Sequence, residues 1–145
     1  MRIVLQRVSE ASVEVSGKTV GAIGRGFLLL VGADAGDQES NASYLADRCL
    51  GMRIFEDDAG KMNLSVTDVR GEILAVSQFT LAADISKGRR PSFTSAMQPA
   101  QAERLFSFFV KELAGSGLKV ETGEFGAKME VRLTNDGPAT FVLEG

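Results

Sequence analysis

The sequence predicts a single α/β domain, a β-barrel-like roll of mostly antiparallel strands with two main helices. The chain has 145 residues, the usual size of one domain, and no internal repeat or linker divides it. Its hydrophobic content of 44% is enough for a buried core. Strand patterns come first along the chain, and helical and strand patterns then alternate, which is the order expected of such a roll.

The first third of the chain favours strands. Residues 2–8 predict one strand, and residues 11–16 alternate apolar and polar side chains, as in a second strand with one solvated face. A turn at Gly17-Lys18 leads to a short strand over residues 19–23. Residues 27–31 are apolar at every position and predict a strand buried on both faces. We expect these four strands to form a β-meander.

Two stretches carry apolar residues at helical spacing. The first begins after Gln38, and the second opens at Pro99, a residue favoured in the first turn of a helix. Their apolar positions are Ala42, Leu45, Ala46, Cys49 and Leu50 in the first, and Ala102, Leu105, Phe106, Phe109 and Leu113 in the second. Because Cys49 lies on the apolar face, we interpret it as a buried small hydrophobic residue and not as a reactive thiol.

The later segments predict short strands over residues 73–76, 118–122 and 129–133. Asp136-Gly137 is a tight-turn signal, so we expect one strand to end there and the last strand to begin at Pro138. The residues around the Gly137–Pro138 bond do not determine its isomer, although most bonds of this kind are trans.

The chain has no histidine and one cysteine. This composition excludes a Ser-His-Asp or Cys-His nucleophile, an internal disulfide and the usual zinc sites within the chain. Glu56, Asp57 and Asp58 follow a short predicted strand over residues 53–55. Their spacing lacks the other ligands of a calcium loop, so we interpret them as a solvated turn. We expect no metal and no cofactor.

The net charge of the chain is −3, which argues against a general binder of polyanions. Contact with nucleic acid therefore requires a local basic patch. Lys87, Arg89 and Arg90 lie together in a polar loop; they suit phosphate binding, although a solvated loop explains them equally well. The N-terminus has too short an apolar run for a signal peptide, and no run reaches the length of a membrane helix. We expect a cytoplasmic protein without membrane contact.

A candidate site follows the predicted strand over residues 73–76. This strand stays apolar and then ends in Ser77-Gln78-Phe79-Thr80, so polar side chains and backbone N–H groups emerge at the rim of the core. Uncharged donors at a strand end can hold a substrate carbonyl and stabilise an oxyanion. A strand capped by ordinary polar residues accounts for the same pattern and stays open as an alternative.

Two motifs in this order resemble the D-aminoacyl-tRNA deacylase family. The first is Ser77-Gln78-Phe79-Thr80, and the second is Asn135-Asp136-Gly137-Pro138-Ala139-Thr140. The resemblance covers the whole chain and includes Arg7, the loop from Lys87 to Phe93, and the segment from Gly123 to Met129. One departure is Ala139, where the family usually has valine.

The resemblance implies an enzyme that hydrolyses the ester joining a D-amino acid, or glycine, to the 3′ end of tRNA and spares L-aminoacyl-tRNA. It also implies a homodimer, in which Ser77, Gln78, Phe79 and Thr80 form the floor of the site. Gly137 and Pro138, joined by a cis bond, reach in from the other subunit. The residues implied to support this arrangement are Arg7, Met129 and Asn135, and the candidates for tRNA binding are Lys87, Arg89 and Arg90.

Two mechanisms fit these residues. The Gln78 amide and the N–H of Phe79 or Thr80 are suitable oxyanion donors, and water assisted by the 2′-hydroxyl of the terminal ribose is then the nucleophile. Thr80 as a covalent nucleophile is the alternative, but it needs a base, and the chain offers neither histidine nor a terminal amine there. We favour the RNA-assisted route.

Two other functions stay open. One is a non-catalytic RNA-binding module, which the acidic net charge disfavours, as does the absence of an exposed aromatic cluster from the sequence pattern. The other is a different small-ester hydrolase on the same scaffold. Turnover of D- and L-aminoacyl-tRNA distinguishes all three functions.

Overall fold

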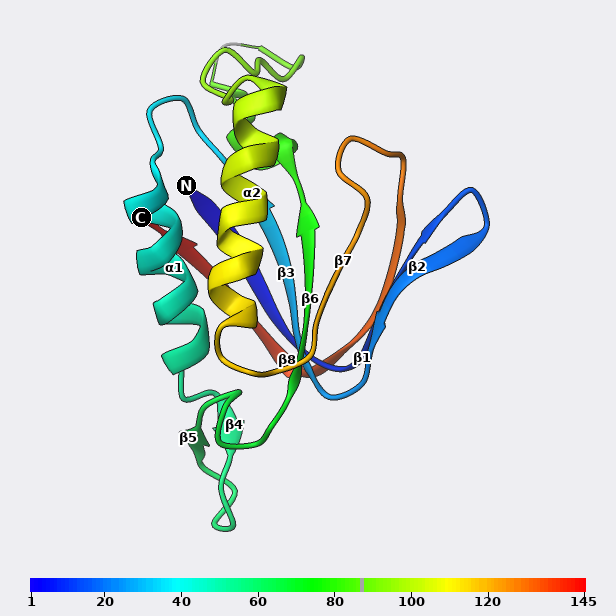
Figure 1. The fold of residues 1–145 in the computed structure, drawn as a ribbon, viewed down its shortest axis with the longest axis vertical. Coiled ribbons are helices and arrows are strands. Elements are labelled where there is room, and N and C mark those ends of the chain that lie inside the picture. The colour runs from blue at the N-terminus through cyan, green and yellow to red at the C-terminus, as the bar shows by residue number, and fades with distance from the viewer. Residues whose placement is uncertain (87) are drawn as a thin grey trace.

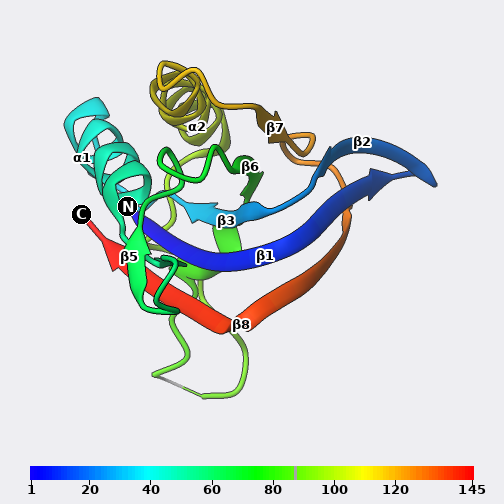
Figure 2. The same cartoon turned by 90° about the horizontal axis from the view of Figure 1, so that it is seen from below.

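The computed structural model describes residues 1–86 and 88–145 (Figure 1). A six-stranded sheet curls into a barrel-like roll, and helices α1 (Glu39–Gly51) and α2 (Pro99–Ala114) pack against one of its faces (Figure 2). The sheet contains β1 (Arg2–Val15), β2 (Lys18–Ile23), β3 (Gly26–Gly32), β6 (Glu72–Ser77), β7 (Val120–Thr122) and β8 (Glu130–Glu144). A short 3₁₀ helix η1 (Phe79–Ala82) and a small hairpin of β4 (Phe55–Glu56) and β5 (Met62–Leu64) complete the fold. The predicted α/β roll is confirmed.

Strand β1 lies at the centre of the sheet. One of its edges pairs antiparallel with β8, and the other pairs antiparallel with β3 over residues 2–8 and with β2 over residues 11–15. The two strands predicted for this segment are therefore one, and the order β2-β1-β3 replaces the expected meander. Ser9 lies where the register between β1 and β8 shifts, so it forms a bulge that bends β1 without ending it.

The other two pairings of the sheet are parallel. Strand β6 lies between β3 and β7, and the connections on either side of β6 carry α1 and α2. Gly26 pairs with Glu72 where β3 and β6 meet, and a Cβ at Gly26 would lie 1.7 Å from the Glu72 carbonyl oxygen. Only glycine lets the two backbones approach so closely.

The main core lies between the sheet and the two helices. Its largest fully buried side chains include Phe27, Leu45, Phe55, Phe109 and Leu113. Cys49 belongs to the same core, and burial raises the pKa of its thiol to about 12. This confirms its interpretation as a buried small hydrophobic residue. A smaller apolar cluster contains Leu28 and Leu74, so β3 contributes to two clusters and is buried on both faces, as predicted.

Both helices begin where the sequence predicts them. Gln38 is the N-cap of α1, and its backbone N–H donates to the Asn41 side chain at 2.7 Å. Pro99 lies in the first turn of α2, and Gly115 follows its last residue. The apolar stripe of α2 is buried through Leu105, Phe106, Phe109 and Leu113.

Two predictions for the later strands are wrong. The strand expected over residues 53–55 is β4, which covers only Phe55–Glu56 and pairs with an unpredicted β5. Strand β8 does not end at Asp136-Gly137. The register with β1 jumps from Gln6 opposite Thr140 to Val8 opposite Asn135, so residues 136–139 leave the ladder and β8 then continues. Residues 136–139 therefore form an excursion from β8 and not a turn between two strands, because the parts of β8 before and after them both pair with β1.

The acidic residues after β4 form a turn, as predicted. Asp57 accepts hydrogen bonds from the N–H groups of Ala59 (2.9 Å) and Lys61 (3.0 Å), and the Lys61 N–H is the main cause of its lowered pKa. Within residues 1–86 and 88–145, no group of three or more acidic, histidine or cysteine side chains is arranged to hold a metal ion. No helix in this part of the chain is long and apolar enough to cross a membrane.

Candidate active site

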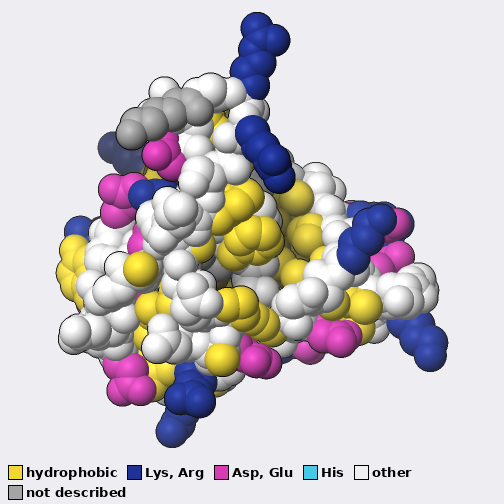
Figure 3. Space-filling model, turned by 90° about the horizontal axis from the view of Figure 1, so that it is seen from above, with side chains coloured by type: hydrophobic (Ala, Val, Ile, Leu, Met, Phe, Trp, Pro, Cys, Tyr) yellow, Lys and Arg dark blue, Asp and Glu magenta, His cyan; other side chains and the backbone are white. Residues whose placement is uncertain are grey.

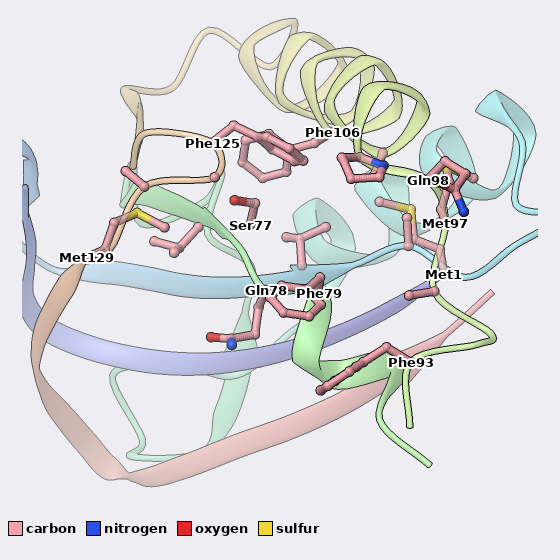
Figure 4. Close-up of a pocket in the computed structure, with 18 of the residues that line it drawn as sticks. Met1, Ser77, Gln78, Phe79, Phe93, Met97, Gln98, Phe106, Phe125 and Met129 are labelled. Carbon is pink, nitrogen blue, oxygen red and sulfur yellow. The ribbon is translucent and has the colours of Figure 1, made fainter. Parts of the chain in front are cut away.

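A cavity of about 570 Å³ lies at the carboxyl end of β6 (Figure 4). The ends of β3 and β6, the start of η1, the first turns of α2 and the segment before β8 all contribute to its wall. Its lining includes Met1, Ser77, Gln78, Phe79, Phe93, Met97, Phe106, Phe125 and Met129. A mostly apolar hollow with a few polar groups is the usual form of a small-molecule site.

The turn that begins at Ser77 is held against β3. The Gln78 N–H donates to the Val31 carbonyl at 2.7 Å, and the Leu81 N–H donates back to the Gln78 carbonyl at 3.2 Å. A Cβ on Gly32 would lie 2.9 Å from the Gln78 carbonyl oxygen, so glycine permits this close approach. The Arg2 guanidinium donates to the Leu81 carbonyl and holds η1 from its other end.

The polar groups of this turn have distinct positions. Ser77, Gln78 and Phe79 line the cavity, whereas Thr80 is exposed and does not belong to the lining. The Gln78 amide nitrogen donates to the Thr80 hydroxyl. The N–H groups of Phe79 and Thr80 are the first two of η1 and have no acceptor within that helix. The turn therefore offers hydrogen-bond donors close to the cavity.

A second group of predicted site residues gathers around the excursion from β8. Arg7 is 4% exposed, and its guanidinium donates to the carbonyl oxygens of Asp136 (3.0 Å) and Ile54 (2.5 Å). The Gly137–Pro138 bond is cis, as the resemblance implied, and Gly137 has a φ of 133°. Both residues of this bond are exposed. Arg7 therefore fixes the excursion from its buried side.

Asn135 spans the base of the same excursion. Its side-chain oxygen accepts the Ala139 N–H at 2.8 Å, and its amide nitrogen donates to the Ala139 carbonyl at 3.4 Å. Neither Gly137 nor Pro138 lines the cavity of its own chain. One chain thus brings Ser77, Gln78 and Phe79 together but keeps the Gly137–Pro138 segment apart from them.

Met129 joins the cavity through the segment that precedes β8. It lines the wall, and its sulfur lies 2.5 Å from where a Cβ on Gly123 would be. Glycine at this position therefore leaves the room that the Met129 side chain occupies. Figure 4 shows Met129 at one side of Ser77, with Phe125 above it.

The basic loop is closed at its base by the backbones of Asp84 and Ser92, which exchange two hydrogen bonds of 2.8 and 2.9 Å. Arg89 and Arg90 are exposed, and neither forms an ion pair with any described residue. Lys87 lies outside the described residues. The space-filling view shows apolar side chains in a hollow, with both basic and acidic side chains around it (Figure 3).

The expectation that the chain lacks an exposed aromatic cluster is wrong. The residues Phe79 and Phe93 are 61% and 38% exposed, and their ring centroids lie 5.0 Å apart with 57° between the ring planes. Both rings line the cavity. Phe93 stands in a polar stretch after the basic loop and belongs to no periodic apolar pattern, and this was the signal that set it apart from core phenylalanines.

Comparisons with known proteins identify the family of the chain. The sequence model of a family described as D-Tyr-tRNA(Tyr) deacylase matches residues 4–144. The chain is 58% identical over 144 residues to a D-aminoacyl-tRNA deacylase of Geobacter sulfurreducens, covering 99% of this chain and 95% of that protein. It is also 58% identical over 144 residues to the D-aminoacyl-tRNA deacylase of Lactobacillus acidophilus, with 99% of both proteins covered.

Solved structures share the fold. A protein titled c-Myc DNA Unwinding Element Binding Protein superposes with a TM-score of 0.94 at 42% identity, over 100% of this chain and 99% of that one. A probable eukaryotic D-amino acid tRNA deacylase superposes with a TM-score of 0.84 at 19% identity, over 99% and 98% of the two chains, and this similarity concerns the fold alone. From the family match and the full-length relatives together, the chain belongs to the D-aminoacyl-tRNA deacylase family.

Proposed function

We propose that this protein hydrolyses the ester between a D-amino acid and the 3′ end of tRNA, and that it also removes glycine from mischarged tRNA. The observation that carries the proposal is the cavity at the end of β6, in a chain 58% identical over 144 residues to proteins named D-aminoacyl-tRNA deacylase. The products are free amino acid and tRNA. The reaction uses neither a metal nor a cofactor.

The donors of the Ser77–Thr80 turn stabilise the oxyanion. A side-chain amide has two N–H groups, so Gln78 keeps one for the substrate while the other donates to Thr80. The N–H groups at the start of η1, which have no acceptor within that helix, add further donors. One well-placed donor is worth roughly 10²–10³ in rate. That contribution is substantial for an aminoacyl ester, which is already reactive.

Water, assisted by the 2′-hydroxyl of the terminal ribose, is the nucleophile in this proposal. The Thr80 hydroxyl accepts a hydrogen bond from Gln78, and an amide is not a base that could remove its proton. The chain has no histidine to take that role. These contacts support water over Thr80 as the attacking group.

A second copy of the chain completes the site. Gly137 and Pro138 are exposed, and they are fixed by Arg7 and Asn135 at a place where they do not line their own cavity. A homodimer that inserts this segment into the neighbouring cavity gives the exposed residues a function. It also accounts for the rigid support beneath them.

Selection for handedness follows from a backbone wall beside the substrate Cα. Gly137 has no Cβ, so its backbone can approach closely and block the side on which an L side chain projects. A D side chain points away from the wall, and glycine has no side chain to clash. The wall therefore rejects L-aminoacyl-tRNA without recognising any particular D side chain.

Turnover of D-aminoacyl-, glycyl- and L-alanyl-tRNA tests this function. We expect the first two to be hydrolysed and L-alanyl-tRNA to be spared by more than about a hundredfold, since a steric clash exceeds the 1–3 kcal/mol that a pocket gains from one methyl group. Equal turnover of glycyl- and L-alanyl-tRNA contradicts the wall. Binding without turnover favours an RNA-binding module, and hydrolysis of simple esters alone favours a different esterase.

A further inference from the structure

An aromatic pair lies exposed at the edge of the cavity. Phe79 comes from the start of η1 and Phe93 from the segment after the basic loop, and both rings line the cavity. Figure 4 shows Ser77 near the middle of the cavity, with Phe79 and then Phe93 farther from it. Because the residue Phe79 is 61% exposed and Phe93 is 38% exposed, the pair offers surface to a flat apolar ligand.

The basic loop leads along the chain directly into Phe93. Ser92 closes the loop by pairing with Asp84, and Phe93 is the next residue along the chain. Arg89 and Arg90 project from the same loop and form no ion pair with the described residues. Aromatic rings together with cations are the combination by which proteins hold single-stranded nucleic acid.

We propose that Phe79 and Phe93 stack the unpaired bases that precede the terminal adenosine of the RNA, while Arg89 and Arg90 contact the adjoining phosphates. This inference rests on the proposed function. The terminal nucleotide enters the cavity to bring its ester to the Ser77–Thr80 turn. The strand before it must then leave across the cavity edge, where the aromatic pair lies.

Another exposed aromatic residue provides a contrast. Tyr44 on α1 is 51% exposed, but the Arg48 guanidinium lies over its ring, 5.8 Å from the centroid. Tyr44 does not line the cavity. It is therefore a matched control, because its substitution changes exposed aromatic surface without changing the cavity edge.

The experiment compares two substrates that differ only in the nucleotides before the terminal one. Phe93→Leu and Phe93→Tyr are assayed on D-aminoacyl-tRNA and on the D-aminoacyl ester of adenosine. We expect Phe93→Leu to lower kcat/KM for the tRNA by about tenfold, mainly through KM, because the variant loses the stacking of one base. Phe93→Tyr keeps the ring and restores the value. Turnover of the adenosine ester falls much less than turnover of the tRNA, and Tyr44→Leu changes turnover of neither substrate.

Several results overturn the proposal. An equal loss on both substrates means that Phe93 shapes the cavity, and no loss on either means that it stacks nothing. Dissociation of Phe93→Leu into monomers in sedimentation assigns the pair to a protein interface. If the wild type turns over neither substrate, the proposed function fails. Binding of a labelled single-stranded RNA with the 3′ sequence of tRNA, measured for wild type and Phe93→Leu, then decides the stacking separately.

Discussion

At the scale of single residues, we propose different roles for Gln78 and Thr80, although a hydrogen bond joins them. Replacing Gln78 with alanine removes the proposed oxyanion donor, and we expect a loss of about 2.7–4 kcal/mol in transition-state stabilisation. Thr80→Ala should leave substantial activity, because the hydroxyl only receives the Gln78 N–H. Single-turnover rates on D-aminoacyl-tRNA provide the measurement. An acyl group trapped on Thr80 and found by mass spectrometry reverses the assignment.

At the scale of elements, the loop between Asp84 and Ser92 is proposed to contact phosphates. Arg89→Ala and Arg90→Ala should each weaken tRNA binding, and the slope of log K against log salt should fall by up to about one unit per lost contact. Arg132→Ala is the control, since Arg132 on β8 already pairs with Glu14 and Glu130. Titrations at several salt concentrations check the slopes. If charge reversal at both arginines leaves the tRNA affinity unchanged, the loop is a solvated loop that does not bind phosphates.

The parallel pairing of β3 with β6 depends on one glycine. Gly26→Ala should destabilise the fold by about 3 kcal/mol or more, because the new Cβ has no room beside the Glu72 backbone. Gly51→Ala, at the end of α1, is the matched control: nothing lies within 4 Å of its Cβ, and we expect stability to be kept or raised by up to about 1 kcal/mol. Urea unfolding measures both variants. Equal stability of the two variants contradicts the close approach of the Gly26 and Glu72 backbones.

At the scale of the whole molecule, hydrogen-bonded carboxylates make stability sensitive to acid. The pKa values of four carboxyl groups are lowered: Asp57, Asp68, Glu72 and Asp84. For Glu72 the main cause is the Gly24 N–H, which donates to the carboxylate at 2.8 Å. A lowered pKa means that the folded state binds fewer protons than the unfolded state. This stabilisation is therefore present above the ordinary pKa and is lost as pH falls.

Thermal melting at a series of pH values tests this consequence. The melting temperature should begin to fall near the ordinary pKa values of 4.5 for Glu72 and 3.8 for the aspartates, and it should continue to fall below them. Asp57→Asn should reduce the acid sensitivity, whereas Asp58→Asn in the same turn serves as its control. A melting temperature that rises on acidification below pH 4 contradicts the predicted loss of stability in acid.

The arrangement of the whole molecule separates the two halves of the candidate site. The cavity with Ser77 lies at the end of β6, and Gly137 is held on the excursion from β8 by contacts with Arg7. Both motifs, the one at Ser77 and the one at Gly137, were identified in the sequence. The sequence did not predict where the surrounding residues lie in space. For example, the Asn135 side chain accepts the Ala139 N–H only because the excursion brings these two residues of β8 together.

The sequence by itself determined the features that local patterns control. Helical spacing located α1 and α2, and the unbroken apolar run predicted the strand of β3 that is buried on both faces. The apolar run before Ser77 located the end of β6 and the polar turn after it. These features follow from the periodicity of apolar side chains, which can be seen within a short segment of the chain.

Only the tertiary structure decided where strands continue and which side chains stay exposed. Strand β1 passes through Ser9, and β8 passes through the Asp136–Gly137 signal, because distant partners supply the backbone hydrogen bonds on both sides. Phe93 lies at the cavity edge and not in the core because a loop closed by Asp84 and Ser92 places it beside Phe79. Pairing and burial between distant segments depend on the whole chain, so no local pattern records them.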